Sequence, residues 1–289
     1  MKLFPASFCL IIMCSFIHAQ GLERIIVEKY YVSTAKDTAV QKGGHLPIGS
    51  ITYRIYADLK PIYRLQAVYG VPGHELRIAT TTLFFNHEEY GAATANDINK
   101  YHLKENTVML DSWVSVGAGA NDYFGISKVD DNGVGTVVNA DGILQNDDTT
   151  AGVPIKTQDG LIPQKLQSIV TPFGIDTALS IFFGKNNDGT NGPVFSTYNG
   201  SWASFGGAIG YNGASDNKVL IGQFTTNGVF SFELNIQIGT PNFGVENYVS
   251  RNPIDKEIVL PSLIYPMPAE EGIKKENKIP PVLKKKNKH

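Results

Sequence analysis

The feature that most constrains how this chain folds is a strict alternation of apolar and polar residues in separate segments. Residues 230–238 alternate without a break, and residues 51–59 repeat the pattern. Alternation with a period of two is typical of β-strands that bury one face, whereas an amphipathic helix repeats about every 3.6 residues. We therefore predict two half-buried strands. Their apolar faces are Ile51, Tyr53, Ile55, Ala57 and Leu59 in one, and Phe230, Phe232, Leu234, Ile236 and Ile238 in the other.

A tight hairpin is predicted at Asn227-Gly228. This pair adopts the two positive φ angles of a type I′ turn more readily than other residues. Residues 218–226 precede it as a partner for residues 230–238. Folding the chain there brings apolar residues together on one face. The expected pairs are Ile221 with Leu234 and Val219 with Ile236.

Many other short strands are expected, separated by turns rich in Asn, Asp and Gly. This arrangement predicts an all-β fold, an antiparallel β-sandwich. The one segment expected to be helical, for a turn or two, is residues 95–103, which begins near the capping residues Asn96 and Asp97. The further strand candidates are residues 23–32, 64–69, 76–85, 108–116, 135–138, 178–183 and 257–264.

The chain also contains an approximate internal repeat. Residues 111–118 (DSWVSVGA) resemble residues 200–207 (GSWASFGG), and Leu83-Phe84-Phe85 and Ile181-Phe182-Phe183 precede the two copies. Two similar halves, packed as one unit or as tandem domains, explain this pattern, and so does chance similarity between β-rich segments. We divide the chain into a first β half at 20–150 and a second at 151–268.

The first nineteen residues have the features of a secretory signal peptide. Lys2 precedes an apolar run from residue 3 to 17, and Ala19 stands just before the expected cleavage at Gln20. The run is too short for a comfortable membrane span, and no later segment predicts a transmembrane helix. Both cysteines, Cys9 and Cys14, lie within it, so thiol chemistry and disulfides are excluded from the mature chain. We expect a secreted protein, extracellular or at the cell surface.

Charge is divided unevenly between the body and the C-terminal tail. Residues 20–273 hold 17 Lys and Arg against 26 Asp and Glu, a net charge of −9. Residues 269–289 are lysine-rich with almost no apolar face, which predicts a disordered tail, either solvated or in contact with an anionic partner. An acidic body repels phosphate, so nucleic-acid binding is not expected.

Six sequence blocks stand out along the chain. They are Tyr53 to Asp58 (YRIYAD), Thr80 to Asn86 (TTTLFFN), Asp111 to Gly117 (DSWVSVG), Gly200 to Trp202 (GSW), Lys218 to Gly228 (KVLIGQFTTNG) and Asn235 to Gln237 (NIQ). These blocks resemble an uncharacterised group of secreted bacterial proteins, in which they recur, sometimes as modules of larger exported chains that end in a sorting domain. The resemblance implies export from a bacterium and a β-rich module, and it carries over no catalytic residue. A lysine-rich tail stands here in place of a sorting domain.

Aromatic residues are the candidate ligand contacts. Trp113 and Trp202 occupy equivalent places in the repeated block, which favours core packing, and contact with a sugar is the alternative. Tyrosines in loop-like sequence are better candidates, because they combine a flat ring with a hydroxyl. These are Tyr63, Tyr69, Tyr90, Tyr123, Tyr198 and Tyr211.

Calcium is the one cofactor that the sequence suggests. Asp130, Asp131 and Asp188 lie in Asn/Asp/Gly-rich stretches that either bind Ca²⁺ or form turns, and none follows the spacing of a known calcium loop.

Hydrolytic chemistry has little support in the sequence. A Gly-x-Ser-x-Gly motif is absent, and His74, His87 and His102 match no zinc spacing. Asp58 and Asp111 are the carboxylates within the resembling blocks, and Asp58 is expected to pair structurally with Arg54 on the polar face of its strand.

The sequence therefore predicts a non-catalytic extracellular module with a structural or adhesive role, whose partner is a glycan or a cell-surface protein. A carbohydrate-binding module is the alternative, for which exposed tyrosines would carry saturable binding. A glycan-active hydrolase is the second alternative, and it requires a deep pocket with paired carboxylates.

Overall fold

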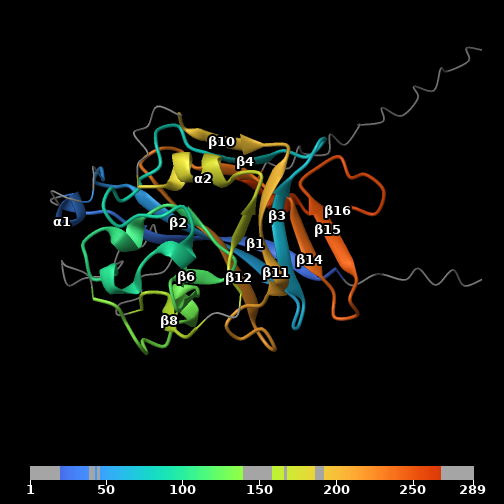
Figure 1. Cartoon of the computed structure of the whole chain (residues 1–289), viewed down its shortest axis with the longest axis horizontal. Coiled ribbons are helices and arrows are strands. Elements are labelled where there is room, and N and C mark those ends of the chain that lie inside the picture. The colour runs from blue at the N-terminus through green and yellow to red at the C-terminus, as the bar shows by residue number, and fades with distance from the viewer. Residues whose placement is uncertain are drawn as a thin grey trace, which may run out of the picture.

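The computed structural model describes residues 20–38, 43, 46–138, 158–165, 168–185 and 192–267. The predicted signal peptide and the lysine-rich tail lie outside them. Four sheets are formed by the described strands (Figure 1). The central sheet has the order β1 (Leu22–Val32), β2 (Ile51–Leu59), β12 (Asn217–Thr226) and β5 (Trp113–Val114). The six-stranded sheet has the order β16 (Ile258–Val259), β15 (Val245–Val249), β14 (Ile236–Gly239), β3 (Arg64–Gly70), β11 (Gly200–Ala208) and β9 (Thr171–Phe173).

Two smaller sheets complete the set. The β4 sheet has the order β10 (Val194–Thr197), β4 (Leu76–Ala79), β13 (Ser231–Glu233) and β17 (Ile264–Tyr265). The small sheet has the order β6 (Ala118–Ala120), β7 (Tyr123–Gly125) and β8 (Leu161–Pro163). Strand pairing is antiparallel except between β15 and β16. The prediction of an all-β, sandwich-like fold is confirmed.

The central sheet buries both of its faces. One face packs against the six-stranded sheet and the β4 sheet, around a core rich in phenylalanine from β12, β13, β10 and α2 (Asp176–Phe183). The other face packs against a second core, formed with β6, β8 and the 3₁₀ turns η1 (Ala95–Asp97) and η3 (Val108–Leu110). Figure 1 shows β6 and β8 in the lower left part of the molecule and β15 and β16 on its right-hand side.

The burial of β2 on both sides corrects the prediction for residues 51–59. The expected apolar face is buried as predicted, but Thr52, Arg54 and Tyr56 on the opposite face are also buried, at 0–1% exposure. Alternation shows which side chains share a face, but it does not show whether water or another layer of protein covers that face.

The predicted hairpin at Asn227-Gly228 is wrong. Strand β12 pairs with β2 and β5, whereas residues 231–239 are divided between β13, which pairs with β4 and β17, and β14, which pairs with β15 and β3. Neither turn residue has the positive φ that a type I′ turn requires. Instead, the Val229 N–H donates to Thr81 Oγ1 and the Gly228 N–H to Thr226 Oγ1, which leads the chain from one sheet into the other.

Several shorter predictions also change. Residues 23–32 and 64–69 are the strands β1 and β3, and residues 95–103 form η1 and a second 3₁₀ turn, η2 (Lys100–His102). Residues 178–183 form most of helix α2, because Leu179 and Phe183, one helical turn apart, are buried on the same side. Only parts of the other candidates are strands, with none at 135–138. These parts are Leu76–Ala79, Trp113–Val114, Ile258–Val259 and Ile264, the first residue of β17.

The two sequence halves are interleaved. β2 from the first half pairs with β12 from the second, β3 pairs with β11 and β14, and β4 pairs with β10 and β13. The matching blocks also differ in structure. Trp113 lies in a strand of two residues in the central sheet, whereas Trp202 lies in a strand of nine residues in the six-stranded sheet. The two predicted halves therefore contribute strands to the same sheets.

The six-stranded sheet and the β4 sheet share a corner. The chain passes from β3 to β4 and from β13 to β14 at this corner, so two paired segments bend together. Asn235 is buried there, and its Nδ2 donates to the carbonyls of Tyr69 (3.0 Å) and Glu75 (2.9 Å). One side chain thereby holds the end of β3 in place.

Candidate functional site

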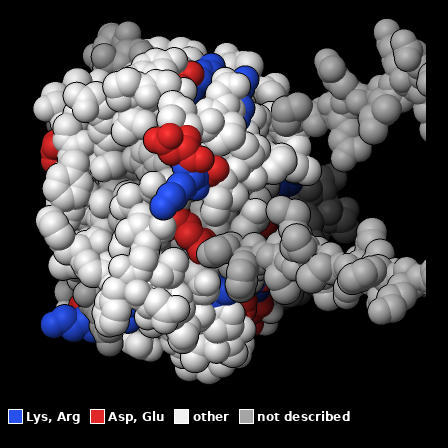
Figure 2. Space-filling view, turned by 90° about the vertical axis from the view of Figure 1, so that its right-hand side faces the viewer, with Lys and Arg blue, Asp and Glu red and all other residues white. Residues whose placement is uncertain are grey.

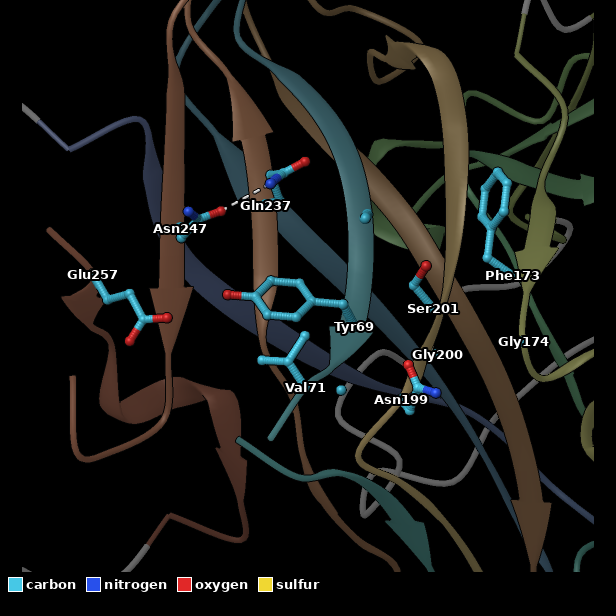
Figure 3. A pocket seen from close by; sticks show the side chains of 12 residues that line it. Tyr69, Val71, Phe173, Gly174, Asn199, Gly200, Ser201, Gln237, Asn247 and Glu257 are labelled. Carbon is cyan, nitrogen blue, oxygen red and sulfur yellow. Dashed lines mark hydrogen bonds between the residues drawn. The ribbon is translucent and has the colours of Figure 1, made fainter. Parts of the chain in front are cut away.

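The outer face of the six-stranded sheet carries an open groove of about 630 Å³ (Figure 3). Strand pairing brings its lining residues from all parts of the chain into two rows. Ser201 on β11 lies opposite both Tyr69 on β3 and Phe173 on β9. In the next row Gln237 on β14 lies opposite Asn247 on β15. The groove thus runs across the strands, from Phe173 at one side to Asn247 and Glu257 at the other.

The core beneath the groove fixes which residues face outward. Trp202, Val68, Ile236 and Tyr248 are cross-strand neighbours on the inner face, and each is 0–1% exposed. Side chains alternate between the two faces of a strand, so burial of these four residues turns Ser201, Tyr69, Gln237 and Asn247 toward solvent. The groove face is therefore fixed by the hydrophobic core.

Glycines at the floor of the groove allow close packing beneath it. A Cβ added at Gly70 would lie 2.2 Å from the Thr197 carbonyl oxygen, and one at Gly200 would lie 2.4 Å from Ile175. Both positions are therefore restricted to glycine by close packing. Gly174 also lines the groove and has a φ of +70°, a conformation that glycine adopts without strain.

One aromatic ring and two side-chain amides supply most of the contacts that the groove offers to a ligand. The Tyr69 ring lies in its middle, with its hydroxyl directed toward the side of Asn247 and Glu257 (Figure 3). Burial, together with the nearby Glu257 carboxylate, raises the pKa of Tyr69 to about 12, so the phenol stays neutral and retains its proton for donation. The side-chain amides of Gln237 and Asn247 are joined by a hydrogen bond of 3.0 Å.

Aromatic side chains continue beyond the far side of the groove. Phe173 is 43% exposed, and its ring meets the Phe205 ring edge to face, with centroids 5.7 Å apart. Phe205 itself is 79% exposed. These rings offer a flat apolar surface to a ligand lying across the strands.

Glu257 is the one carboxylate among the described residues that line the groove. Its Oε2 lies 2.8 Å from Nε2 of His74, which is almost fully buried, and also accepts a hydrogen bond from the Ile254 N–H. These contacts fix the carboxylate at the edge of the groove. The end of the molecule at β15 and β16 carries few charged side chains overall (Figure 2).

The predicted tyrosines do not form a single site. Tyr69 lines the groove, and Tyr123 lines a separate pocket beside the small sheet. Tyr63 packs against the core, Tyr90 stacks on His102 with ring centroids 3.9 Å apart, and Tyr211 contacts Phe124. Tyr198 is exposed on the turn between β10 and β11.

The two tryptophans belong to the core. Trp113 is 2% exposed and Trp202 is 1% exposed, and the Trp202 Nε1 donates to the Ser115 carbonyl oxygen at 3.2 Å. The alternative in which they contact a ligand is therefore wrong for both. The sequence did not single out five of the groove residues, which are Phe173, Asn199, Gln237, Asn247 and Glu257. Gln237 could have been found, because it occupies an outward-facing position of a segment with alternating apolar and polar residues.

The three predicted calcium ligands do not come together. Asp130 forms an ion pair with Lys218 at 2.9 Å, and Asp131 accepts hydrogen bonds from the backbone N–H groups of Gly133 and Gly160. Asp188 lies outside the described residues. Within the described ranges no group of three or more His, Asp or Glu side chains is arranged to hold a metal ion.

The carboxylates considered for hydrolysis have structural contacts. Asp58 pairs with Arg24 at 2.9 Å, so the predicted pair with Arg54 is wrong. Asp111 is fully buried and accepts hydrogen bonds from the backbone N–H groups of His87 (2.7 Å) and Ala92 (2.9 Å). Burial raises the pKa of Asp111 to about 8.

Arg54 instead belongs to a buried charged cluster, which also contains Glu28, Tyr30, Lys128 and Asp159. The Arg54 guanidinium lies 3.6 Å from the centroid of the Tyr30 ring and donates to Gln223 Oε1 at 2.8 Å and to the Gly160 carbonyl oxygen at 2.9 Å. Burial raises the pKa of Glu28, raises that of Asp159 to about 6 and lowers that of Lys128 to about 8. The cluster has no opening among the pockets described here and is assigned a structural role.

Among the described residues, no helix is long and apolar enough to cross a membrane. Comparison of the chain with protein-family models, with curated proteins and with solved structures gives no match.

Proposed function

We propose that this protein is a secreted, non-catalytic adhesive module and that the groove of its six-stranded sheet binds a neutral carbohydrate chain. The observation that carries the proposal is the alignment of Tyr69, Ser201 and Phe173 across three adjacent strands, beside the paired amides of Gln237 and Asn247. An export signal at residues 1–19 supports the assignment to the cell exterior.

The chemistry of the groove suits a sugar. Aromatic rings stack on the apolar C–H faces of pyranose rings, and amide groups donate to and accept from sugar hydroxyls at the same time. Binding sites commonly combine apolar surface with a few fixed polar groups, and the groove has both. Its extension across the strands fits a linear chain better than a compact ligand.

We propose binding without hydrolysis because of the number of carboxylates that line the groove. A glycosidase flanks the scissile bond with two carboxyl groups, about 5–10 Å apart. The described lining of this groove supplies one, Glu257, which is engaged by His74. This arrangement supports a role in holding glycan rather than in cleaving it.

The test is a screen of neutral oligosaccharides on a glycan array, followed by calorimetry with the best ligand. Tyr69→Ala is expected to weaken binding by about tenfold, because it removes the central aromatic surface. Tyr69→Phe is expected to retain most of the affinity, since the ring remains. The matched control is Tyr101→Ala, which removes a tyrosine that is 75% exposed and lies away from the groove.

The proposal fails if no neutral glycan binds saturably, or if Tyr69→Ala binds as tightly as the unaltered protein. Thermal unfolding of each variant shows that a loss of binding is not a loss of fold.

A further inference from the structure

A second pocket lies beside the small sheet, at the opposite end of the molecule from β15 and β16. It has a volume of about 530 Å³ and is formed by η2 and the turn after it, by β7 and by the end of β8. Its charged lining residues are Lys100, Lys104, Asp122 and Lys165. This composition contrasts with the groove, whose described lining contains no lysine or arginine.

The pocket gathers positive charge in a body that is acidic overall. Lys100 is held in place by an ion pair with Asp122, with Nζ 2.8 Å from Oδ2. Lys104 and Lys165 are exposed, and neither forms an ion pair within the described residues. Three lysines and one aspartate leave the pocket with an excess of positive charge, whereas residues 20–273 carry a net charge of −9. An anionic group is therefore attracted to this pocket more than to the surface around it.

Two tyrosines also line the pocket, beside Pro163 and Gln164. Tyr101 is 75% exposed, and the Lys100 Nζ lies 5.6 Å from the centroid of its ring. Tyr123 belongs to β7 and is half-buried. A ligand in this pocket meets ammonium groups and flat rings together, which is the combination that binds a ring carrying an anionic substituent.

We infer that this pocket binds an anionic sugar chain, one that carries carboxylate or sulfate groups. Its volume exceeds that of a single inorganic anion, and its lining supplies three lysines, each of which carries a separate point charge. This site goes beyond the proposed function, because it takes a different ligand at a different end of the protein.

The experiment measures binding of tetragalacturonate and of a heparin-derived tetrasaccharide by calorimetry, which separates carboxylate from sulfate as the source of charge. Methyl-esterified tetragalacturonate is the matched ligand, with the same rings and no charge. The double variant Lys104→Gln/Lys165→Gln is expected to weaken binding by about fivefold. Raising NaCl from about 0.05 M to about 0.5 M is expected to weaken it as well, since salt screens exposed charges.

Two protein controls distinguish this site from the groove. Lys256→Gln removes an exposed lysine near β16, far along the chain from the pocket, and is expected to leave binding unchanged. Tyr69→Ala is expected to weaken binding of the neutral glycan and to leave binding of the anionic one unchanged, whereas Tyr101→Ala is expected to do the reverse. The two proposals therefore fail separately.

Three results would overturn the inference. The first is that neither anionic tetrasaccharide binds. The second is that the double lysine variant binds as tightly as the unaltered protein, or that the methyl ester binds as tightly as charged tetragalacturonate. The third is that a single-stranded oligonucleotide of equal charge binds more tightly than both sugars, which would assign the pocket to nucleic acid.

Discussion

At the scale of single residues, the buried charged cluster sets how stability depends on pH. The Lys128 Nζ is buried, 4.6 Å from the centroid of the Tyr30 ring, and has no hydrogen-bond partner within the described residues. Burial, opposed in part by the nearby Glu28 carboxylate, lowers the pKa of Lys128 to about 8, from an ordinary value near 10.5. The unfolded chain therefore binds one more proton than the folded protein between these two pH values.

This difference predicts that the contribution of Lys128 to the free energy of unfolding rises with pH between about 8 and 10. The contribution of Lys128 over this interval is about 2 kcal/mol, since one pKa unit corresponds to about 1.4 kcal/mol. Lys128→Met is expected to flatten the rise, because methionine has no proton to lose. Urea unfolding of both proteins at the two pH values measures the effect, and equal slopes would contradict it. The interval ends near pH 10 because tyrosines ionise above it.

The burial of a residue could be predicted from the sequence only where the local sequence around it was sufficient. The burial of Trp113 and Trp202 was predicted from their equivalent places in the repeated block. The polar face of β2 did not, because Arg54 and Thr52 are buried by segments more than a hundred residues away, around Gly160 and Thr225. Local alternation contains no information about such distant partners.

At the scale of elements, the corner between the six-stranded sheet and the β4 sheet connects the fold to the groove. The Asn235 amide ties β14 to the carbonyls of Tyr69 and Glu75, at the start and end of the turn between β3 and β4. Tyr69 is also the central aromatic residue of the groove. The position of its ring therefore depends on the geometry of this corner.

Asn235→Ala is expected to lower the free energy of unfolding by about 2–4 kcal/mol, because it leaves two buried carbonyls without their donor. It is also expected to weaken binding of neutral glycan at the groove. Asn247→Ala is the matched control: its amide faces the groove and bonds Gln237, so its loss is expected to change stability by about 0.5 kcal/mol. Chemical unfolding measures both variants. A loss of stability no larger for Asn235→Ala than for Asn247→Ala would contradict the assignment.

Element types could be predicted better than element partners. Strands β1, β2, β3 and the alternating segment 230–238 follow from the period of two, which is a local property. The hairpin at Asn227-Gly228 was wrong because the threonine hydroxyls at residues 80–82 surround this turn, with Gly228 packed against all three. Helix α2 was predicted as a strand because a short apolar run fits both structures, and burial of Leu179 and Phe183 decides between them.

At the scale of the whole molecule, interleaving of the two halves makes the fold one cooperative unit. The central strand β2 is paired on one side with β1 and on the other with β12. The six-stranded sheet likewise combines β3 with β11 and β14. Neither half can form its sheets from its own strands alone.

Residues 20–150 expressed alone are therefore expected to remain unfolded, and residues 20–268 are expected to unfold in one transition. Circular dichroism tests the first expectation, and agreement between the calorimetric and van't Hoff enthalpies tests the second. Two separated transitions, or a folded N-terminal half, would restore the division into tandem domains. Binding at the groove is a further test, because Phe173, Gln237 and Asn247 come from the second half and Tyr69 from the first. Neither half alone is therefore expected to bind the neutral glycan.

The site as a whole was less predictable than the fold class. Tyr69 was among the candidates, but five strands had to be ordered around β3 before its neighbours in the groove were known. That order is decided by long-range pairing, in which Ile51 meets Thr226 and Tyr69 meets Ser201. A single sequence does not encode such pairs in any local pattern.

The pairing of Ile51 with Thr226 also has a consequence for biosynthesis. A nascent polypeptide must have reached residue 226 before its innermost ladder can close, by which point most of its length has already emerged from the ribosome. Until then the ladder between β2 and β12 stays unpaired. The export that we propose would benefit from this late closure, because a chain that has not yet collapsed can pass lengthwise through a narrow channel.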